Sequence, residues 1–311
     1  MNIQQIDYLL TVAELRHFGR AADQCNITQS TISTMVARFE EELGLQIFDR
    51  RTKPISITRE GEQVIQQLEV IRKELGSLSA LVATLKGEEK GVFKIGVIPT
   101  IGPYLLPLFL NTFVSRFPKI RFEVSELTTD QIVRDLKNRD LDVGLVSVPL
   151  KDSAIREYFL FDEPFWCFDT KYSDKAGRME IRELDYDRLW LLAEGHCMRT
   201  QVSKICALQE SYGGLRNLDY KAATLNTLVK FVTAGEGVTL LPFLASRDLT
   251  ESERLHLREF VPPAPCRSVG LITHEHFTKK ILLTALRQEI LAAMEGVLPN
   301  WNENFQRLDP V

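Results

Sequence analysis

The sequence predicts an α/β protein with a small helical domain first, then a long linker helix and a two-lobed α/β domain. Three observations support this prediction: three short amphipathic segments followed by a basic turn, one long apolar repeat, and strands that alternate with helices. A chain of 311 residues has room for roughly two domains, each with its own core. We expect a winged helix-turn-helix over residues 1–58, a linker helix over 59–90, the two-lobed domain over 91–296 and a tail over 297–311.

Capping residues predict where the first three helices begin and end. Asn2 and Gln5 have capping-box spacing ahead of an apolar stripe, and a second short helix is expected from about Phe18 to Cys25. Thr28 is a favourable N-cap for the third helix, and Gly44 is suited to end it. The spacing predicts a compact three-helix head.

The third helix has an apolar face and an opposite face of small, polar or cationic side chains. A helix that lies in the major groove of DNA needs such a face, because close approach brings side chains to base edges and phosphates. The candidate DNA-binding residues on this helix are Gln29, Ser30, Thr31, Ser33 and Arg38.

A basic turn is expected between two short strands, Leu45–Phe48 and Ile55–Ile57. Its cations Arg50, Arg51 and Lys53 are candidates for contacts with flanking phosphates. The net charge of −4 argues against non-specific polyanion binding by the whole chain, so the DNA interpretation depends on where the cations lie. The alternative is a structural three-helix module with a solvated basic loop.

A long helix is expected from Thr58 to about Lys86. Its apolar residues repeat by four and three over three heptads, as Val64, Leu68, Ile71, Leu75, Leu78, Val82 and Leu85. Such a narrow seam favours pairing with a second copy, although it could instead pack on its own domain. A dimer would present two recognition helices to two half-sites of a dyad promoter.

The rest of the chain alternates strands and helices, which predicts a mainly parallel sheet in two lobes. The expected strands are Val92–Ile98, Ile120–Ser125, Leu141–Val148, Phe165–Asp169, Trp190–Ala193, Val238–Leu241 and Val269–Thr273. The expected helices are Tyr104–Phe117, Asp130–Arg139, Leu225–Gly235 and Lys279–Met294. Lobe I would comprise about 91–161 and 268–296, and lobe II about 162–267. The cleft between them, with Thr100 at a strand's carboxyl end, is where a ligand would sit.

Composition excludes several other classes of protein. No run of 18 apolar residues suggests a membrane span, and the N-terminus lacks the features of a secretory signal, so we expect a cytoplasmic protein. The five scattered cysteines do not suggest a secreted disulfide framework. His274 and His276 lack a third ligand, so we expect neither a metal site nor a cofactor.

Motifs in both domains resemble a known family. The N-terminal motifs are Phe18-x-x-Ala21-Ala22, Gln29-Ser30-x-x-Ser33, Leu43-Gly44-x-x-x-Phe48 and Thr58-x-x-Gly61. With the domain order, they resemble the LysR-type regulators, whose sensor domains resemble periplasmic binding proteins. The segments Ile95–Pro107, Leu160–Pro164 and Gly195–Arg199, with Cys206, resemble the peroxide-sensing branch of that family.

The resemblance implies a redox role for two cysteines. It implies that Cys197 is oxidised by hydrogen peroxide to a sulfenic acid and that Cys206 resolves it as a disulfide. Positive charge from His196 and Arg199 would favour the reactive thiolate of Cys197. Nine residues of helix span about 13 Å, whereas a disulfide needs Cα atoms within about 7 Å, so a helix between them would have to unwind.

The resemblance also implies a peroxide site formed by Thr100, Thr129, His196 and Arg267. As partners it implies double-stranded DNA, a homotetramer, RNA polymerase, and glutaredoxin or thioredoxin as reductant. The predicted function is peroxide-responsive transcription regulation of oxidative-stress genes rather than catalysis. A LysR-type regulator that binds a small metabolite in the cleft is one alternative, and a thiol peroxidase is another.

Overall fold

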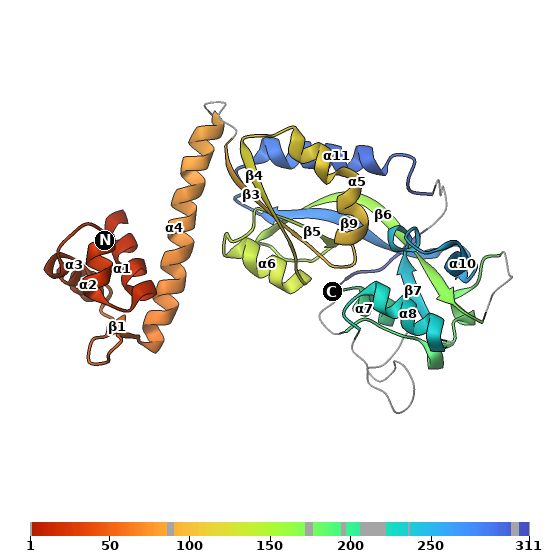
Figure 1. Cartoon of the computed structure of the whole chain (residues 1–311), viewed down its shortest axis with the longest axis horizontal. Coiled ribbons are helices and arrows are strands. Elements are labelled where there is room, and N and C mark those ends of the chain that lie inside the picture. The colour runs from red at the N-terminus through yellow and green to blue at the C-terminus, as the bar shows by residue number, and fades with distance from the viewer. Residues whose placement is uncertain are drawn as a thin grey trace. The chain divides into compact units, whose positions relative to one another are not determined.

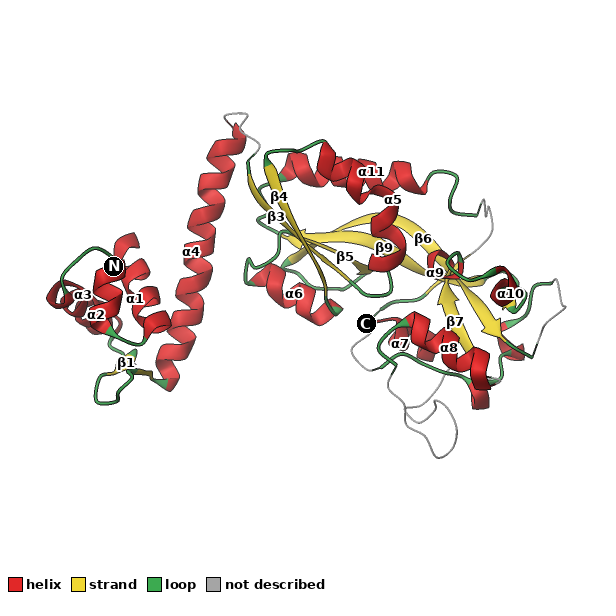
Figure 2. Ribbon diagram, viewed as in Figure 1, coloured by secondary structure: helices red, strands yellow, loops and turns green. Residues whose placement is uncertain are grey.

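The computed structural model describes residues 2–85, 90–171, 177–193, 197–205, 222–235, 237–299 and 305–310. The chain divides into two compact units, residues 1–86 and 87–311. Among the described residues no helix is both long and apolar enough to cross a membrane. Figures 1 and 2 label the helices and strands of both units.

The first unit is a helical head with a two-stranded wing. Its elements are α1 (Ile3–Leu15), α2 (Phe18–Gln24), α3 (Gln29–Leu43), β1 (Phe48–Asp49), β2 (Ser56–Ile57) and α4 (Arg59–Leu85). The two strands pair antiparallel, and each is shorter than the sequence predicts. The predicted winged helix-turn-helix architecture is confirmed.

The predicted capping residues take the expected geometry. Asn2 and Gln5 form a reciprocal capping box at α1, and the Thr28 hydroxyl accepts the Thr31 N–H at α3. Gly44 ends α3 with a φ of 68°, a left-handed conformation that glycine adopts without strain. These local interactions explain why short helices form here in the predicted order.

The apolar seam of α4 divides into two halves. Leu68 is buried in the core of the head, and Val64 and Ile71 pack against the same core. Further along, Leu78 is 58% exposed and Val82 is 42% exposed. The first half of the seam therefore packs on its own domain, whereas the second half leaves apolar side chains in solvent.

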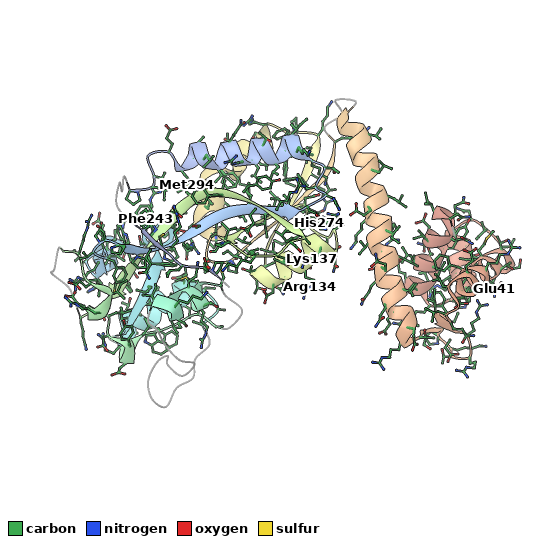
Figure 3. The ribbon with its side chains drawn as sticks, turned by 180° about the vertical axis from the view of Figure 1, so that it is seen from behind. Glu41, Arg134, Lys137, Phe243, His274 and Met294 are labelled. Carbon is green, nitrogen blue, oxygen red and sulfur yellow. The ribbon has the colours of Figure 1, made fainter. Side chains whose placement is uncertain are left out.

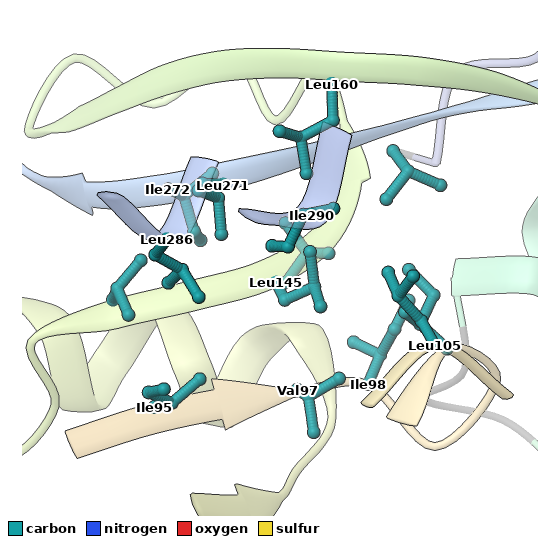
Figure 4. Packing of buried hydrophobic residues seen from close by; sticks show 14 of the residues in the cluster. Ile95, Val97, Ile98, Leu105, Leu145, Leu160, Leu271, Ile272, Leu286 and Ile290 are labelled. Carbon is teal, nitrogen blue, oxygen red and sulfur yellow. The ribbon is translucent and has the colours of Figure 1, made fainter. Parts of the chain in front are cut away.

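Lobe I of the second unit is built on three parallel strands. They are β3 (Gly91–Val97), β4 (Ile120–Glu126) and β5 (Val143–Val148), with β3 in the middle. Helices α5 (Gly102–Ser115) and α11 (Lys280–Met294) lie on one face of the sheet and α6 (Thr129–Lys137) lies on the other, as Figure 1 shows. Figure 4 shows Ile95, Val97 and Leu145 of these strands in the core.

Two long strands run from lobe I into lobe II. They are β6 (Ile155–Asp169) and β9 (Ala264–His274), which pair antiparallel with each other along most of their length. β9 also pairs antiparallel with β5, and β6 pairs antiparallel with β7 (Val238–Pro242). The prediction of a mainly parallel sheet is therefore correct only for β3, β4 and β5 and is wrong for the crossing strands, which pair antiparallel within lobe I as well as in lobe II.

Lobe II and the C-terminal segment contribute the remaining strands of the sheet and several short helices. Their elements are η1 (Ile181–Glu183), η2 (Tyr186–Arg188), α7 (Cys197–Ile205), α8 (Leu225–Gly235), β7 (Val238–Pro242), α9 (Phe243–Ser246), α10 (Glu251–Arg254), β8 (Leu257–Arg258) and β10 (Phe305–Arg307). The predicted strand Trp190–Ala193 is wrong: Leu189 and Leu192 make only isolated bridges.

Candidate functional site

The predicted recognition helix presents its polar face to solvent. Gln29, Ser30 and Arg38 are exposed, and Thr31 and Ser33 are partly exposed. The Thr28 hydroxyl lies 2.9 Å from that of Ser30 and 2.8 Å from that of Thr31, which fixes the first turn. The N-terminal end of α3 thus carries available hydrogen-bonding groups on a rigid helix.

Arg50 connects the wing to the recognition helix. Its guanidinium donates to the Ser33 hydroxyl at 3.1 Å and to the Glu40 carboxylate at 3.0 Å, and it stacks over the Phe18 ring. The other oxygen of Glu40 accepts the N–H groups of Ile47 and Phe48. Arg50 therefore positions the wing against α3, a contact that the sequence analysis did not predict.

Arg51, the next wing cation, is paired with an acid in the free protein. Its Nε and Nη2 donate to the two carboxylate oxygens of Asp49, at 2.9 and 2.8 Å. These hydrogen bonds lower the pKa of Asp49 to about 2, so the acid stays charged. Lys53 is exposed at the tip of the wing. A phosphate would have to compete with Asp49 for Arg51.

A buried ion pair lies between the two crossing strands. Arg267 on β9 faces Glu163 on β6, both are fully buried, and Arg267 Nε donates to the carboxylate at 2.8 Å. Arg267 also donates to the Thr100 hydroxyl at 2.8 Å and to the Thr100 carbonyl at 2.9 Å. The second Glu163 oxygen accepts the Leu244 N–H at 2.8 Å. The structure thus brings together two predicted site residues and one, Glu163, that sequence reasoning missed.

The carboxyl ends of the three parallel strands carry hydroxyl groups. Thr100 follows β3, Thr129 begins α6 just after β4, and Ser147 lies near the end of β5. Thr129 and Ser147 are buried, and neither hydroxyl has a hydrogen-bond partner among the described residues. Because a buried hydroxyl is normally paired, these two groups are available to hydrogen-bond with a bound water or ligand. Ser147 was missed because one Ser in an apolar strand has no local signal.

Cys197 is the first residue of α7, a helix of lobe II. Its side chain is only 8% exposed and packs into the hydrophobic core of lobe I. The next core residues of the same helix, Met198 and Val202, pack into the core of lobe II. The thiol of Cys197 therefore lies where the two lobes meet.

Two predicted site residues, His196 and Cys206, lie outside the described residues. The described helix α7 extends over Cys197–Ile205, so it covers the chain up to the residue before Cys206. Arg199, expected near the thiol, donates its guanidinium to the Leu192 carbonyl at 3.0 Å. The helical state that the sequence analysis considered for this segment is the one observed.

The other described cysteines are less suited to redox chemistry. Cys167 and Cys266 are buried, and Cys25 is partly buried in the head. Burial, with the nearby carboxylate of Asp162, raises the pKa of Cys266 to about 12. Since the thiolate is the nucleophile, Cys266 is unreactive in the folded protein.

Among the cavities in the described part of the second unit, two are large enough to hold a small molecule. The larger, of about 820 Å³, is lined by residues of α5, β6 and α9 and by arginines, among them Tyr104, Trp166, Phe243, Arg247 and Arg254. The smaller, of about 350 Å³, is lined by Thr129 and by Arg134 and Lys137 of α6. Figure 3 shows Phe243 well away from Arg134 and Lys137. Only the smaller cavity includes a residue of the predicted peroxide site.

A winged helix-turn-helix followed by a two-lobed α/β domain defines a DNA-binding transcription regulator. The chain belongs to the LysR family of such regulators. Residues 3–62 match the bacterial regulatory helix-turn-helix of the lysR family, and residues 86–295 match the LysR substrate binding domain.

Similar proteins support this assignment over almost the whole chain. The DNA-binding transcriptional dual regulator OxyR of Escherichia coli is 31% identical over 298 residues, 95% of this chain and 97% of the relative. A probable hydrogen peroxide-inducible genes activator of Streptomyces viridosporus is 35% identical over 276 residues, 87% of each chain. The structure of a cysteine-to-aspartate variant of full-length OxyR from Pseudomonas aeruginosa matches with a TM-score of 0.71 at 28% identity. That match covers 94% of this chain and 98% of the other.

Proposed function

We propose that this chain is a hydrogen peroxide-responsive regulator of transcription, which senses peroxide through Cys197 and a reversible Cys197–Cys206 disulfide. The observation that supports this most directly is the position of Cys197, whose helix belongs to lobe II and whose thiol is buried in lobe I. Several relatives of the chain are named hydrogen peroxide-inducible genes activators, which agrees with the proposal. Oxidation of the Cys197 sulfur would therefore alter the packing of lobe II against lobe I.

The proposed reaction has two steps. The Cys197 thiolate attacks one peroxide oxygen, the O–O bond breaks, and the sulfenic acid forms with release of hydroxide, which takes up a proton to become water. The Cys206 thiolate then attacks the sulfenic sulfur, the S–O bond breaks, and a second water leaves after protonation. Two thiols are oxidised and one peroxide is reduced. A dithiol reductant, glutaredoxin or thioredoxin, would reverse the reaction.

Thr100, Thr129, His196 and Arg267 are the proposed peroxide-binding residues. The Thr129 hydroxyl is buried and has no partner among the described residues, so it is free to donate to and accept from peroxide. Arg267 holds Thr100 through two hydrogen bonds and is itself held by Glu163. We propose that this buried pair fixes the hydroxyl of Thr100 at the strand end.

Disulfide formation would convert chemistry into a conformational change. Helix α7 is described up to Ile205, which lies about 12 Å along the axis from Cys197, whereas a disulfide allows about 7 Å between Cα atoms. Helix α7 would therefore unwind, and closing the roughly ten-residue loop would disfavour the alternative open states by about 2.5–3 kcal/mol. A free energy of this size is enough to shift a two-state equilibrium by roughly a hundredfold.

The output of this change is proposed to be a different spacing of two DNA-binding heads. Gln29, Ser30, Thr31, Ser33 and Arg38 of α3 would read the major groove, and the wing cations Arg50, Arg51 and Lys53 would contact or support contacts with phosphates. Exposed Leu78 and Val82 would pair with a second copy. We propose further that the chain assembles as a homotetramer, contacts RNA polymerase and acts in the cytoplasm. Catalytic turnover of peroxide is not part of this proposal.

The deciding experiment compares wild type and Cys197→Ser. Stoichiometric peroxide should produce a Cys197–Cys206 disulfide by mass mapping and change the wild-type promoter footprint, while the variant's footprint stays constant. A peroxide-dependent footprint in Cys197→Ser would refute the redox proposal. Continuous peroxide consumption over many turnovers per chain would favour a thiol peroxidase instead.

One observation favours a metabolite-responsive regulator as the second candidate. The larger cavity combines three aromatic side chains, Tyr104, Trp166 and Phe243, with four arginines and two acidic residues, so its lining carries an excess of positive charge. Arg247 and Arg254 form no ion pair with a carboxylate among the described residues, so an organic anion would fit there. A footprint that responds to such an anion and not to peroxide would support this candidate.

A further inference from the structure

The C-terminal segment Phe305–Pro310, here called the C-terminal strap, is folded onto both lobes. Its strand β10 pairs parallel with the first three residues of β9, and the Leu308 N–H donates to the Cys266 carbonyl at 3.0 Å. The Leu308 side chain is 6% exposed and lies in the core of lobe II.

Two side chains of α7 bind the main chain of the strap. Gln201 is fully buried, and its Nε2 donates to the Leu308 carbonyl at 2.8 Å. Lys204 Nζ donates to the Asp309 carbonyl at 3.1 Å. Residues three apart lie on the same face of a helix, so these donors reach two consecutive carbonyls only while this turn of α7 is helical.

The other contacts of the strap are ion pairs at its edge. The Asp309 carboxylate accepts from Lys151 of lobe I at 2.8 Å, and Arg307 pairs with Asp162 of β6, also at 2.8 Å. Lys151 and Asp309 are 64% and 41% exposed, and an exposed ion pair contributes little to stability. Arg307 forms a forked pair with Asp162, which is only 12% exposed, and this pair fastens the strap to β6 and not to α7. The side-chain contacts that join the strap to α7 are therefore those of Gln201 and Lys204.

We infer that the C-terminal strap positions the redox helix: it stabilises α7 in the helical, reduced state and is released when α7 unwinds. This inference rests on the proposed Cys197–Cys206 chemistry. By linkage, whatever binds only the helical form must favour the reduced dithiol, so docking of the strap makes disulfide formation less favourable. The Gln201 Oε1 atom is buried without a partner among the described residues, which limits how firmly the docked state is held.

The first test uses the reduced full chain and needs no redox chemistry. Leu308→Ala shortens the buried side chain of the strap, and Lys204→Ala removes one donor while leaving the core intact. Hydrogen–deuterium exchange of the α7 amides should become about tenfold faster in Lys204→Ala, the size expected for the loss of one or two net hydrogen-bond contributions. It should become at least as fast in Leu308→Ala, because truncating a buried leucine costs about 2–5 kcal/mol. Unchanged exchange in both variants would overturn the inference.

Lys151→Gln is the matched control. It removes the exposed ion pair with Asp309 but keeps the Asp309 carboxylate, whose charge also acts on Lys204, and the main-chain carbonyl that Lys204 binds. Exchange of α7 should therefore change by less than about twofold, as expected for an exposed ion pair. A tenfold effect in this control, equal to that of Lys204→Ala, would mean that charge and not the α7 contacts holds the strap, against the inference.

The second test measures the redox equilibrium and the release. In glutathione buffers, the equilibrium constant for disulfide formation should rise about tenfold in Lys204→Ala, which is about 30 mV for two electrons, and Lys204→Arg should restore it. In oxidised wild type with a mapped disulfide, the amides of Gln306–Leu308 should exchange faster. Unchanged strap exchange there would refute release. If wild type forms no disulfide, the proposed function fails, and the reduced-state exchange still decides whether the strap holds α7.

Discussion

The buried pair Glu163–Arg267 gives the sharpest prediction about stability. Both side chains are fully buried, and Arg267 also holds Thr100, which lies 167 residues earlier in the chain. Glu163→Gln removes one charge with little change of shape and leaves the Arg267 cation buried without a counter-ion. Breaking a buried pair in this way costs about 3–5 kcal/mol of the free energy of unfolding.

The assay is urea unfolding of the full chain, followed by tryptophan fluorescence. Trp166, Trp190 and Trp301 all belong to the unit of residues 87–311, so the signal reports that unit and not the head. The matched variant is Glu163→Gln with Arg267→Met, which leaves no unpaired charge and should be more stable than Glu163→Gln alone. A loss below about 1 kcal/mol for the single variant, a value typical of exposed pairs, would refute the reasoning.

Three further predictions test the thiol, the wing and the head. Burial raises the pKa of Cys266 to about 12, so iodoacetamide should leave this thiol unmodified from pH 7 to 9 while it alkylates Cys25, as mass spectrometry would show. Because the pKa of Cys266 is higher in the folded than in the unfolded chain, the contribution of this thiol to the free energy of unfolding should fall only as the pH rises above about 9. Asp49→Asn releases Arg51 from its ion pair, so the affinity for DNA should rise, and the slope of log affinity against log salt concentration should become steeper by about 0.9, the value for one added phosphate contact. The control is Arg51→Ala, which should leave this slope no steeper than in the wild type. Gly61→Ala places a Cβ 2.3 Å from the Ile47 carbonyl oxygen, so it should lower the stability of the head by about 1–3 kcal/mol, measured by hydrogen exchange of the α1 amides. The control is Gly76→Ala, whose Cβ meets nothing within 4 Å and should not destabilise the head.

The features that could be predicted from the sequence are those that depend on interactions between residues close together in the chain. Capping residues such as Asn2 and Thr28 act within three or four positions, so the helices of the head could be placed without knowledge of the fold. The boundaries of α8 were predicted as observed for the same reason: a clear apolar period, followed by a glycine at its end.

The remaining features depend on distant partners. Glu163 meets Arg267 only because two strands, 104 residues apart in sequence, cross in register. Arg50 was predicted to be a phosphate contact, yet its nearest partners are Ser33 and Glu40 of the preceding helix. The contacts of the C-terminal strap with α7 could not be predicted, because they use main-chain carbonyls that every sequence possesses.

The burial of Cys197 in lobe I has a steric consequence as well as a chemical one. Protein cores are packed to the density of organic crystals, so a side chain there cannot gain an atom without displacing its neighbours. One oxygen added to this sulfur enlarges the side chain after folding is complete, like a small-to-large substitution that a reductant can reverse. In such a sensor, the added oxygen would push the two lobes apart, and the response would depend on the size of the modification as well as on its polarity.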